Sequence, residues 1–579
     1  MGFLRHRGYL LSLVAIGTVL AFAACGGGDD NGTEKSPGGG TGAAERIQGG
    51  TLTVQNLEFQ SSDPHYSNFV QDISLERMLW RGPYSLDKDN KPQPAMADGM
   101  PKISTDGKTY TVTLKSGLKW SDGKPLVAKD FALAVLRTCN PDNAGQYESF
   151  AANIVGCDDY YGAKGKAAAP KTPTPEELEA LKSAVGVKAV DDKTVEYTLN
   201  SAQPTFIILL AMWTYFPVPS QLLPDPGEKW PTPPSAQLAY NGPYMVQDYK
   251  PQDSITLVPN PNWAAPAGVK PTLDKLIIRY IEKNDVADNA YRTGELDAAF
   301  ADVGNLGAIK TEFGNEYIRI PTPETRGLEI NVGKPPLDIL EFRLALSQAI
   351  DRDKINEVAS GGATIPTTTW LPEVVGGPPP DAFQDQVGYN PDKAKQNLAT
   401  ARTKYGKDFP KLSVLVRDTP ERKAQAEFLQ NSFKTILGLD TEIQLADSPT
   451  RSKRLNSHDF ELAPASGWSQ DYPDPEDWVG SAAGIFQTGA PNNTAQCSDP
   501  EVDDLSKKAE FNTNEAERLS QYTKINELVS TRVCGYAVYY HGSNNWLIKP
   551  YVVGMRETST GQDAYPPGDW DAEAWGRSK

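Results

Sequence analysis

The feature that most constrains this chain is its longest apolar run, which stands at the amino terminus. Leu10 to Phe22 is apolar, follows Arg5 and Arg7, and is too short to span a bilayer as a helix. No later run of the sequence reaches the length of a membrane span. We therefore predict that residues 1–25 are an export signal and that the remaining chain folds outside the cytoplasmic membrane.

The end of this run resembles a bacterial lipobox, in which small residues precede a cysteine that is acylated. Ala23 and Ala24 precede Cys25, and glycines follow it. An ordinary secretory signal with an incidental cysteine is the alternative, since Phe22 stands where an aliphatic residue is usual. Residues 26–45 are rich in Gly, Ser, Thr and Asp, which predicts a flexible tether with a reach of about 20–25 Å. Cys25 would then anchor the protein to the membrane through lipid.

The other cysteines are even in number, which in an oxidising compartment indicates disulfides. Pairing Cys139 with Cys157, and Cys497 with Cys534, would close two local loops. Four cysteines allow three connectivities, and the sequence does not choose among them. A zinc site is not expected, because the chain has no CxxC pair and only four histidines. We expect no metal and no cofactor.

Charge and motif content exclude several functions. The net charge of −17 argues against nucleic acid, because phosphate binding needs clustered Lys and Arg. It is compatible with a cationic or zwitterionic ligand. The sequence has no GxSxG, HExxH, GxGxxG or Walker motif, and scarce histidine disfavours general-base catalysis. We expect a non-enzyme. A paired-carboxylate glycosidase that uses residues 471–477 (DYPDPED) is a weaker alternative.

The mature chain has about 530 residues, which predicts two or three domains of the α/β or α+β class. Alternating apolar residues predict strands in residues 108–117 and 193–200. Helical spacing predicts one helix in residues 341–355, with its arginines on a solvated face. Thr174 to Glu177 form a capping box, and proline-rich residues 372–383 predict a surface loop.

Seven segments, read in order, resemble the family 5 extracellular solute-binding proteins, which are the dipeptide, oligopeptide and nickel receptors of ABC importers. The resemblance spans roughly residues 49–551. Its segments are GGTLTVQNLEFQSSDPHYS (49–67), LKSGLKWSDGKPLVAKDF (114–131), NGPYMVQDY (241–249), AYRTGELDAAF (290–300), RLALSQAIDRDKI (343–355), GYNPDKAKQNL (388–398) and GWSQDYPDP (467–475).

This resemblance implies an α/β fold of two lobes around a cleft, the periplasmic-binding-protein or Venus flytrap fold, with an extra subdomain inserted in the first lobe. One lobe would be built from both ends of the chain. The implied division is 46–90 for the first part of lobe I, 91–215 for the inserted subdomain, 216–305 for the second part of lobe I, 306–541 for lobe II, and 542–579 for the return to lobe I and the tail.

The resemblance also assigns a role to the segment GWSQDYPDPEDW (467–478). Asp471 matches the aspartate that receives a peptide's α-ammonium, and Trp468 stands three residues before it, as in oligopeptide receptors. A carboxylate withdrawn from water gains much from an ammonium partner. Trp468 and Tyr472 would stack on the ligand. We expect Asp474, Glu476 and Asp477 to organise the turn, because Asp-Pro pairs favour turns.

Further contacts follow from the same resemblance. Arg417 falls where dipeptide receptors place an arginine for the ligand's carboxylate, although a solvated strand-end arginine explains it equally well. Tyr66, Asn68 and Phe69, after Pro64, would face the cleft. Asn68 replaces an acidic residue found in some oligopeptide receptors.

The implied function is capture of di- or oligopeptides between two lobes that close on a hinge, without chemistry. The closed form would dock on an ABC transporter permease. We expect a lipid-anchored monomer on the extracytoplasmic side of the cell membrane. The alternatives are an oligosaccharide, for which eleven tryptophans offer stacking surfaces, a metal chelate, or a surface lipoprotein for signalling or adhesion.

Overall fold

The computed structural model describes residues 45–579 except 88, 144, 165–172, 482 and 557–566. The predicted signal, the lipidation site Cys25 and the tether up to residue 44 lie outside the described residues. Glu45–Lys579 forms one compact unit with a mixed α/β fold. In the described ranges, no helix combines the length and the apolarity that crossing a membrane requires.

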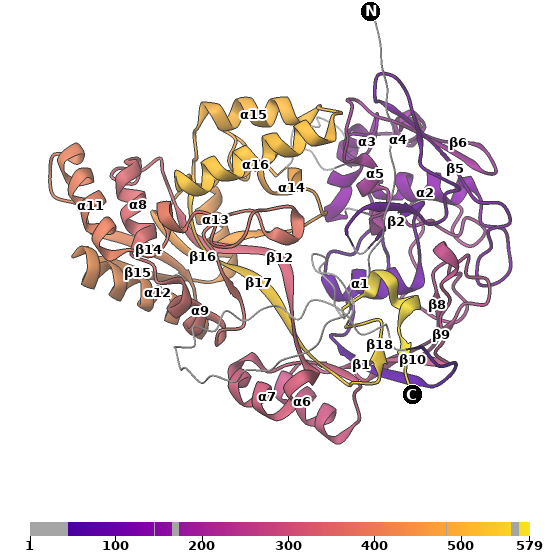
Figure 1. Cartoon of the computed structure of the whole chain (residues 1–579). Coiled ribbons are helices and arrows are strands. Elements are labelled where there is room, and N and C mark those ends of the chain that lie inside the picture. Colours follow the sequence, from indigo (N-terminus) through magenta and orange to yellow (C-terminus); the bar gives the residue numbers. More distant parts are fainter. Residues whose placement is uncertain (1–44, 88, 144, 165–172, 482, 557–566) are drawn as a thin grey trace, which may run out of the picture. The chain divides into compact units, whose positions relative to one another are not determined.

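One large mixed sheet runs through this unit (Figure 1). Its pairs β1–β10, β1–β11, β14–β15 and β14–β16 are parallel, and the other pairs are antiparallel. Its strands, in spatial order, are β15 (Thr441–Ala446), β14 (Leu412–Arg417), β16 (Leu462–Ser469), β12 (Tyr317–Ile330), β17 (Tyr536–Ile548), β11 (Ala298–Phe300), β1 (Thr51–Asn56), β10 (Lys275–Tyr280), β9 (Ser254–Pro259) and β8 (Tyr244–Lys250); β13 (Ile365–Pro366) also pairs with β17.

Strands β12 and β17 connect the two halves of this sheet. They are 14 and 13 residues long. At one end Tyr317 pairs with Leu547, whose neighbour on the other side is β11 of the first half. At the other end Glu329 pairs with Tyr536, beside β16 of the second half. The register shifts between Pro321 and Thr325, so the ladder is irregular between the two halves.

A second sheet lies in the segment predicted as an insertion. It has four antiparallel strands, and it contains both strands predicted from alternation: Tyr110 pairs with Tyr197 and Val112 with Val195, all four buried. The lobe and subdomain boundaries themselves stay predictions. The strands, in spatial order, are β4 (Lys102–Ile103), β5 (Thr109–Thr113), β7 (Thr194–Thr198) and β6 (Val187–Asp191), and α2 (Ala128–Thr138) packs against them.

Local sequence signals explain several element ends. The capping box is confirmed: Thr174 Oγ1 accepts from the Glu177 backbone N–H at 3.2 Å, and Glu177 Oε2 accepts from the Thr174 N–H at 2.7 Å. Helix α4 (Pro175–Ala184) begins there. Residues 372–383 contain the short 3-10 turn η7 (Glu373–Val375).

The single helix predicted over residues 341–355 is wrong, because the structure has two. Helix α8 (Leu340–Gln348) ends and α9 (Arg352–Ser360) begins after Asp351, whose side chain caps α9 by accepting from the Lys354 N–H at 3.2 Å.

The solvated position predicted for the arginines of this segment is also wrong. Arg343 is 8 % exposed and Arg352 is 6 % exposed. The Arg343 Nε donates to the Val533 carbonyl at 3.0 Å, and the Arg352 Nε donates to the Thr367 carbonyl at 2.8 Å. Both guanidinium groups are therefore held inside by backbone carbonyls from distant segments.

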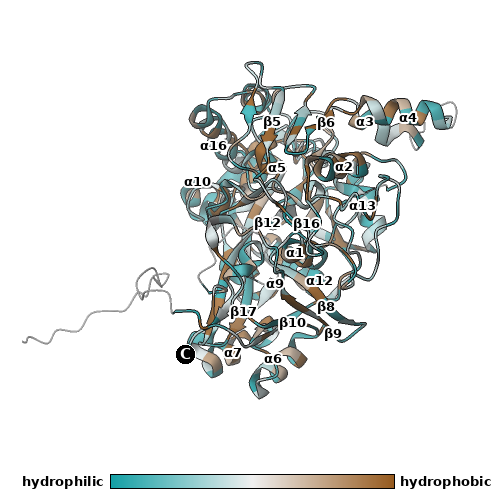
Figure 2. Cartoon of the chain, turned by 90° about the vertical axis from the view of Figure 1, so that its right-hand side faces the viewer, coloured by the Kyte–Doolittle hydropathy of each residue, from teal (hydrophilic) through white to brown (hydrophobic). Residues whose placement is uncertain are grey.

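Helix α12 (Pro420–Ser432) packs against β14, β15 and β16 of the large sheet, and α9 packs against β17. Helix α13 (Ser448–Asn456) has no buried residue and is mostly hydrophilic in Figure 2. The other helices are α1 (Val70–Leu79), α3 (Cys157–Tyr161), α5 (Phe206–Leu209), α6 (Asn284–Thr293), α7 (Leu306–Phe313), α10 (Gln384–Val387), α11 (Pro391–Tyr405), α14 (Glu476–Val479), α15 (Pro500–Glu510) and α16 (Glu515–Thr531).

Two disulfides join neighbouring segments. Cys139, at the end of α2, is bonded to Cys157 at the start of α3, 18 residues away. Cys497 is bonded to Cys534, 37 residues away, across α15 and α16. Of the three possible connectivities, the structure has the one that closes two local loops.

Candidate functional site

The segment GWSQDYPDPEDW begins with the last residues of β16 and continues into a turn. Trp468 and Ser469 pair with Thr325 and Glu324 of β12, so the segment starts as a strand in the second half of the sheet. Gly467 is required here, because a Cβ at that position would lie 1.8 Å from the Thr325 carbonyl oxygen. The strand ends at Ser469, Pro473 and Pro475 follow in the turn, and α14 begins at Glu476.

The acidic residues predicted to organise this turn do so. Asp474 Oδ1 accepts from the Glu476 N–H at 2.9 Å. The Asp474 carboxylate also receives two hydrogen bonds, at 2.7 and 2.8 Å, from the guanidinium of Arg518 on α16, and this pair is buried. Asp477 Oδ2 accepts from the Asp471 N–H at 2.8 Å. These hydrogen bonds within the protein fix the turn without a ligand.

Glu476 joins the turn to the inserted segment. Its Oε2 accepts from the Tyr472 hydroxyl at 2.8 Å and from the Thr205 hydroxyl at 2.9 Å, and Thr205 precedes α5. Burial, followed by the nearby Asp474 charge, raises the pKa of Glu476 to about 7.

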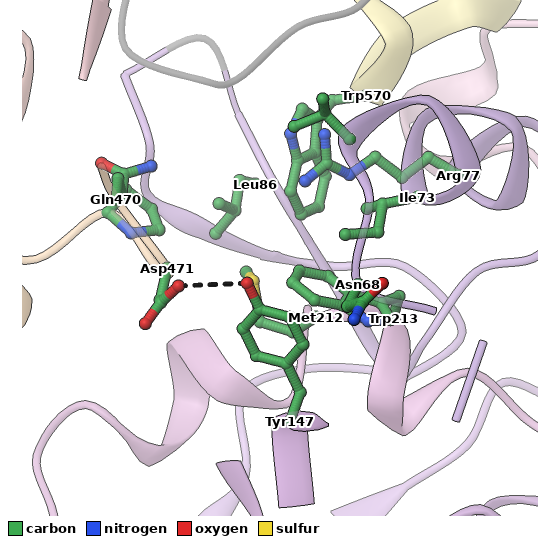
Figure 3. Close-up of a pocket in the computed structure, with 12 residues that line it drawn as sticks. Asn68, Ile73, Arg77, Leu86, Tyr147, Met212, Trp213, Gln470, Asp471 and Trp570 are labelled. Carbon is green, nitrogen blue, oxygen red and sulfur yellow. Dashed lines mark hydrogen bonds between the residues drawn. The ribbon is translucent and has the colours of Figure 1, made fainter. Parts of the chain in front are cut away.

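Asp471 lies in a small cavity of about 60 Å³ (Figure 3). The Tyr147 hydroxyl donates to Asp471 Oδ1 at 3.2 Å, as the dashed line in Figure 3 marks. Tyr147 belongs to the 3-10 turn η1 (Gln146–Phe150), 324 residues away in the chain. The other lining residues include Asn68, Ile73, Arg77, Leu86, Met212, Trp213, Gln470 and Trp570.

Among the described residues, no cationic side chain is paired with the Asp471 carboxylate. Burial raises its pKa, and the Tyr147 hydrogen bond opposes that shift. Burial and then the Asp471 charge hold the pKa of Asp477 well above its usual range. Arg77, on the same cavity wall, is paired with buried Asp569 at 3.1 Å.

The other predicted ligand residues are spread around this site. Asn68 lines the cavity beside Asp471. Trp468 packs against the hydrophobic cluster of the second half, and its indole N–H donates to Asp477 at 3.4 Å. Tyr472 is buried, and its ring lies 6.0 Å from that of Phe150. Neither aromatic residue is among those that line the cavity.

Three further predicted residues also lie off the cavity wall. Tyr66 and Phe69 are 54 % and 43 % exposed. Arg417 is exposed at the end of β14, paired in register with Ala446. Their contacts with a ligand stay predictions, which depend on how the ligand extends from Asp471.

The residues that sequence reasoning missed come from segments distant in the chain. Tyr147 lies in the segment QYESF, which carries no motif, and Trp570 lies in the tail beyond the family resemblance. Apart from the predicted stacking of Trp468 and Tyr472, the eleven tryptophans of the chain were the general sign of aromatic stacking surfaces. Tertiary contacts alone bring them to Asp471.

A larger cavity, of about 960 Å³, lies on the other side of Pro473. Its walls come from the inserted segment, η7 and α16, and include Ile103, Val374 and Leu519. Across its rim Lys91 pairs with Glu515 at 3.3 Å. None of the predicted ligand contacts lines this cavity, so the candidate site is the smaller one.

No metal centre is found in the described ranges, where no group of three His, Cys, Asp or Glu side chains is arranged to hold an ion. His65 and His541 are buried and bonded to backbone carbonyls, at 3.1 Å from Phe216 and 2.9 Å from Thr369. Burial lowers the pKa of His541 to about 4, so it stays neutral at physiological pH. The Asp471 cavity therefore offers a carboxylate for a cationic ligand group, next to aromatic and apolar surface.

Comparison with known proteins points to one family of binding proteins. Residues 91–486 match the model of the bacterial extracellular solute-binding proteins, family 5. The chain is 29 % identical to the periplasmic oligopeptide-binding protein OppA of Escherichia coli over 522 residues, which cover 89 % of this chain and 90 % of OppA. It is 26 % identical to the oligopeptide-binding protein OppA of Bacillus subtilis over 577 residues, 96 % of this chain and 98 % of that protein.

Solved structures agree in fold. The unliganded open form of the periplasmic murein tripeptide-binding protein MppA superposes with a TM-score of 0.76 at 22 % identity. The superposition covers 93 % of this chain and 99 % of MppA. The predicted two-lobed α/β fold is therefore confirmed.

Proposed function

The chain belongs to the bacterial extracellular solute-binding proteins of family 5, and on that premise we propose that it captures peptides with a free amino end and delivers them for import. Asp471 receives the ligand's α-ammonium, and Tyr147 holds the carboxylate in place. The relatives named above are oligopeptide-binding proteins, which supports the peptide class.

The observation that carries this proposal is the environment of Asp471. Its side chain is half-buried, receives one hydroxyl hydrogen bond, and faces a cavity without an internal cation partner among the described residues. A desolvated carboxylate in that state gains strongly from an incoming ammonium. A glycosidase would need a second carboxylate facing the same cavity, and among the described residues Asp471 is the only acidic one on its wall.

Capture proceeds by closure of the lobes. The ligand contacts Asp471 from the second half of the sheet and Tyr147 from the inserted segment, so it stabilises the arrangement in which both walls are near. Delivery to an ABC permease and anchoring through Cys25 belong to the same proposal. An oligosaccharide or a metal chelate in place of the peptide leaves the receptor function intact and changes the ligand class.

The test is calorimetric titration of the mature protein with di- to pentapeptides, each with a free or an acetylated amino end. Asp471→Ala removes one member of a desolvated ion pair, which costs about 2–5 kcal/mol, or roughly thirty-fold to several thousand-fold in affinity. Asp504→Ala, on an exposed surface pair of α15, is the matched control and should bind like the parent.

Acetylation supplies an independent readout, because it removes the ligand's charge and leaves the protein unchanged. We expect acetylated peptides to bind the parent as weakly as free peptides bind Asp471→Ala. Equal affinity of free and acetylated peptides would contradict the ammonium role of Asp471. Binding of a sugar or a chelate, with no peptide bound, would remove the peptide from the proposal.

A further inference from the structure

The wall of the Asp471 cavity includes a residue from the C-terminal tail. Trp570 belongs to the 3-10 segment η9 (Asp569–Ala574), which follows β17 and β18 (Val552–Val553) and lies beyond the residues that match the family model. Its side chain lines the same cavity as Asp471 and Tyr147, and it is 4 % exposed. The tail therefore supplies part of the candidate binding site.

Helix α1 and Arg81, two residues beyond its end, hold this tail by two buried ion pairs. Arg77 pairs with Asp569 at 3.1 Å, and Arg81 pairs with Glu573 at 2.9 Å; these four side chains are at most 8 % exposed. Arg81 also donates to the Trp570 carbonyl. The Arg77 guanidinium lies 4.1 Å from the centre of the Trp570 ring, and Figure 3 shows the two groups against each other. Arg81 thus holds the backbone of Trp570, and Arg77 packs on the face of its ring.

The wall around this indole is partly apolar and partly polar, since Asn68, Arg77 and Gln470 also line the cavity. Ile73, Leu86, Met212 and Trp213 line the same cavity. The Trp213 indole N–H is already bonded to the Ser67 carbonyl at 3.2 Å. The Trp570 N–H is buried and has no hydrogen-bond partner among the described residues. The free volume of this cavity is about 60 Å³.

We propose that Trp570 is a specificity-determining residue, which closes the compartment that Asp471 also lines and restricts the first residue of the ligand to a small uncharged side chain. This inference rests on the proposed function, since it takes the ammonium on Asp471 as its fixed point. The first side chain of a peptide branches from the carbon that carries the ammonium, so it must occupy the space next to Asp471. A bulky ring there would collide with the indole.

The charge on the same wall restricts the ligand further. Arg77 is balanced by Asp569 and offers no acceptor to a cationic side chain. A lysine or arginine as first residue would bring a second cation beside Arg77 in a desolvated compartment, which is unfavourable. Peptides that begin with alanine should bind better than those that begin with phenylalanine or lysine.

The experiment compares Gly-, Ala-, Phe- and Lys-Ala-Ala, and the same series extended to pentapeptides, on the parent, Trp570→Ala and Trp570→Phe. Glycine places no side chain in the compartment, so binding of the glycine peptide reports an intact ammonium site and a folded protein. We expect Trp570→Ala to raise the Phe-to-Ala affinity ratio about tenfold, in the range typical of a pocket that gains or loses one or two methylene groups. Trp570→Phe should raise it by a smaller factor.

The outcomes separate this inference from the proposed function. If the glycine peptide binds all three proteins and the Phe-to-Ala ratio stays within twofold of the parent in both variants, Trp570 does not set specificity and peptide capture stands. If no free-amine peptide binds the parent, the proposed function fails and this inference fails with it. If Trp570→Ala does not fold, the ratio measured with Trp570→Phe alone decides.

Discussion

The buried pair between Asp474 and Arg518 should stabilise the fold without contributing to ligand binding. Two hydrogen bonds of 2.7 and 2.8 Å join the side chains, which are 6 % and 7 % exposed. Asp474→Asn leaves the shape of the turn and removes the charge opposite a buried guanidinium. Breaking a buried pair on one side costs about 3–5 kcal/mol, because the other charge is left uncompensated.

The resulting shift in melting temperature depends on how much of the chain unfolds together. Unfolding entropy is roughly 2.1 cal/mol/K per residue, so a unit that spans Glu45–Lys579 gives a shift of about 3–5 °C. A unit restricted to the predicted second lobe, residues 306–541, gives about 6–10 °C. Differential scanning calorimetry of the parent and Asp474→Asn measures the shift and distinguishes the two units.

Two companion variants make the reasoning refutable. Glu527→Gln breaks the exposed Lys524–Glu527 pair on the same helix, where both side chains are more than 40 % exposed, and should shift the melting temperature by less than about 1 °C. Combining Asp474→Asn with Arg518→Met removes both charges and should recover much of the loss. A shift for Asp474→Asn no larger than that for Glu527→Gln, or no recovery in the double variant, would refute this account.

Two further predictions concern titration and anchoring. Because the folded-state pKa of Glu476 is about 7, above its usual 4.5, its contribution to stability is present below pH 4.5 and is lost as the pH rises through 7. The melting temperature of Glu476→Gln should therefore be higher than that of the parent at pH 8, and this difference should vanish by about pH 5. A difference that is the same at both pH values would contradict the burial of an ionised Glu476. Cys25→Ala should move the protein from the membrane to the soluble fraction on sedimentation, and an unchanged membrane fraction would exclude lipidation at Cys25.

The sequence predicted those elements whose signals are local. The alternation around Tyr110 and Tyr197 determines which face of each strand is buried, and the structure pairs these two residues directly. The capping box at Thr174 is likewise contained in four neighbouring residues. The break between α8 and α9 was missed although the apolar spacing stops at Ile350, since Ile355 would lie on the opposite face of one continuous helix. The local signal of the break is Asp351, which caps the second helix.

The burial of charged residues could not be predicted in this way. Arg343 is accommodated inside because its Nε reaches a carbonyl 190 residues away, and Arg352 reaches one 186 residues away. For the site, the sequence pointed to Asp471 and to the turn that follows it. It could not supply Tyr147 or Trp570, because their nearness to Asp471 is produced only by the packing of the inserted segment and the tail.

The four carboxylates between Asp471 and Asp477 differ in what satisfies them. Asp474 has the guanidinium of Arg518, Glu476 has two hydroxyl donors, and Asp477 has a backbone N–H and an indole N–H. Asp471 has one hydroxyl donor and faces the cavity. Since burying a carboxylate is costly unless it is paired, the first three are retained as parts of a rigid turn. The unmatched charge at Asp471 is the remainder that an ammonium ligand would complete, and the turn that the other three carboxylates organise holds Asp471 at the cavity.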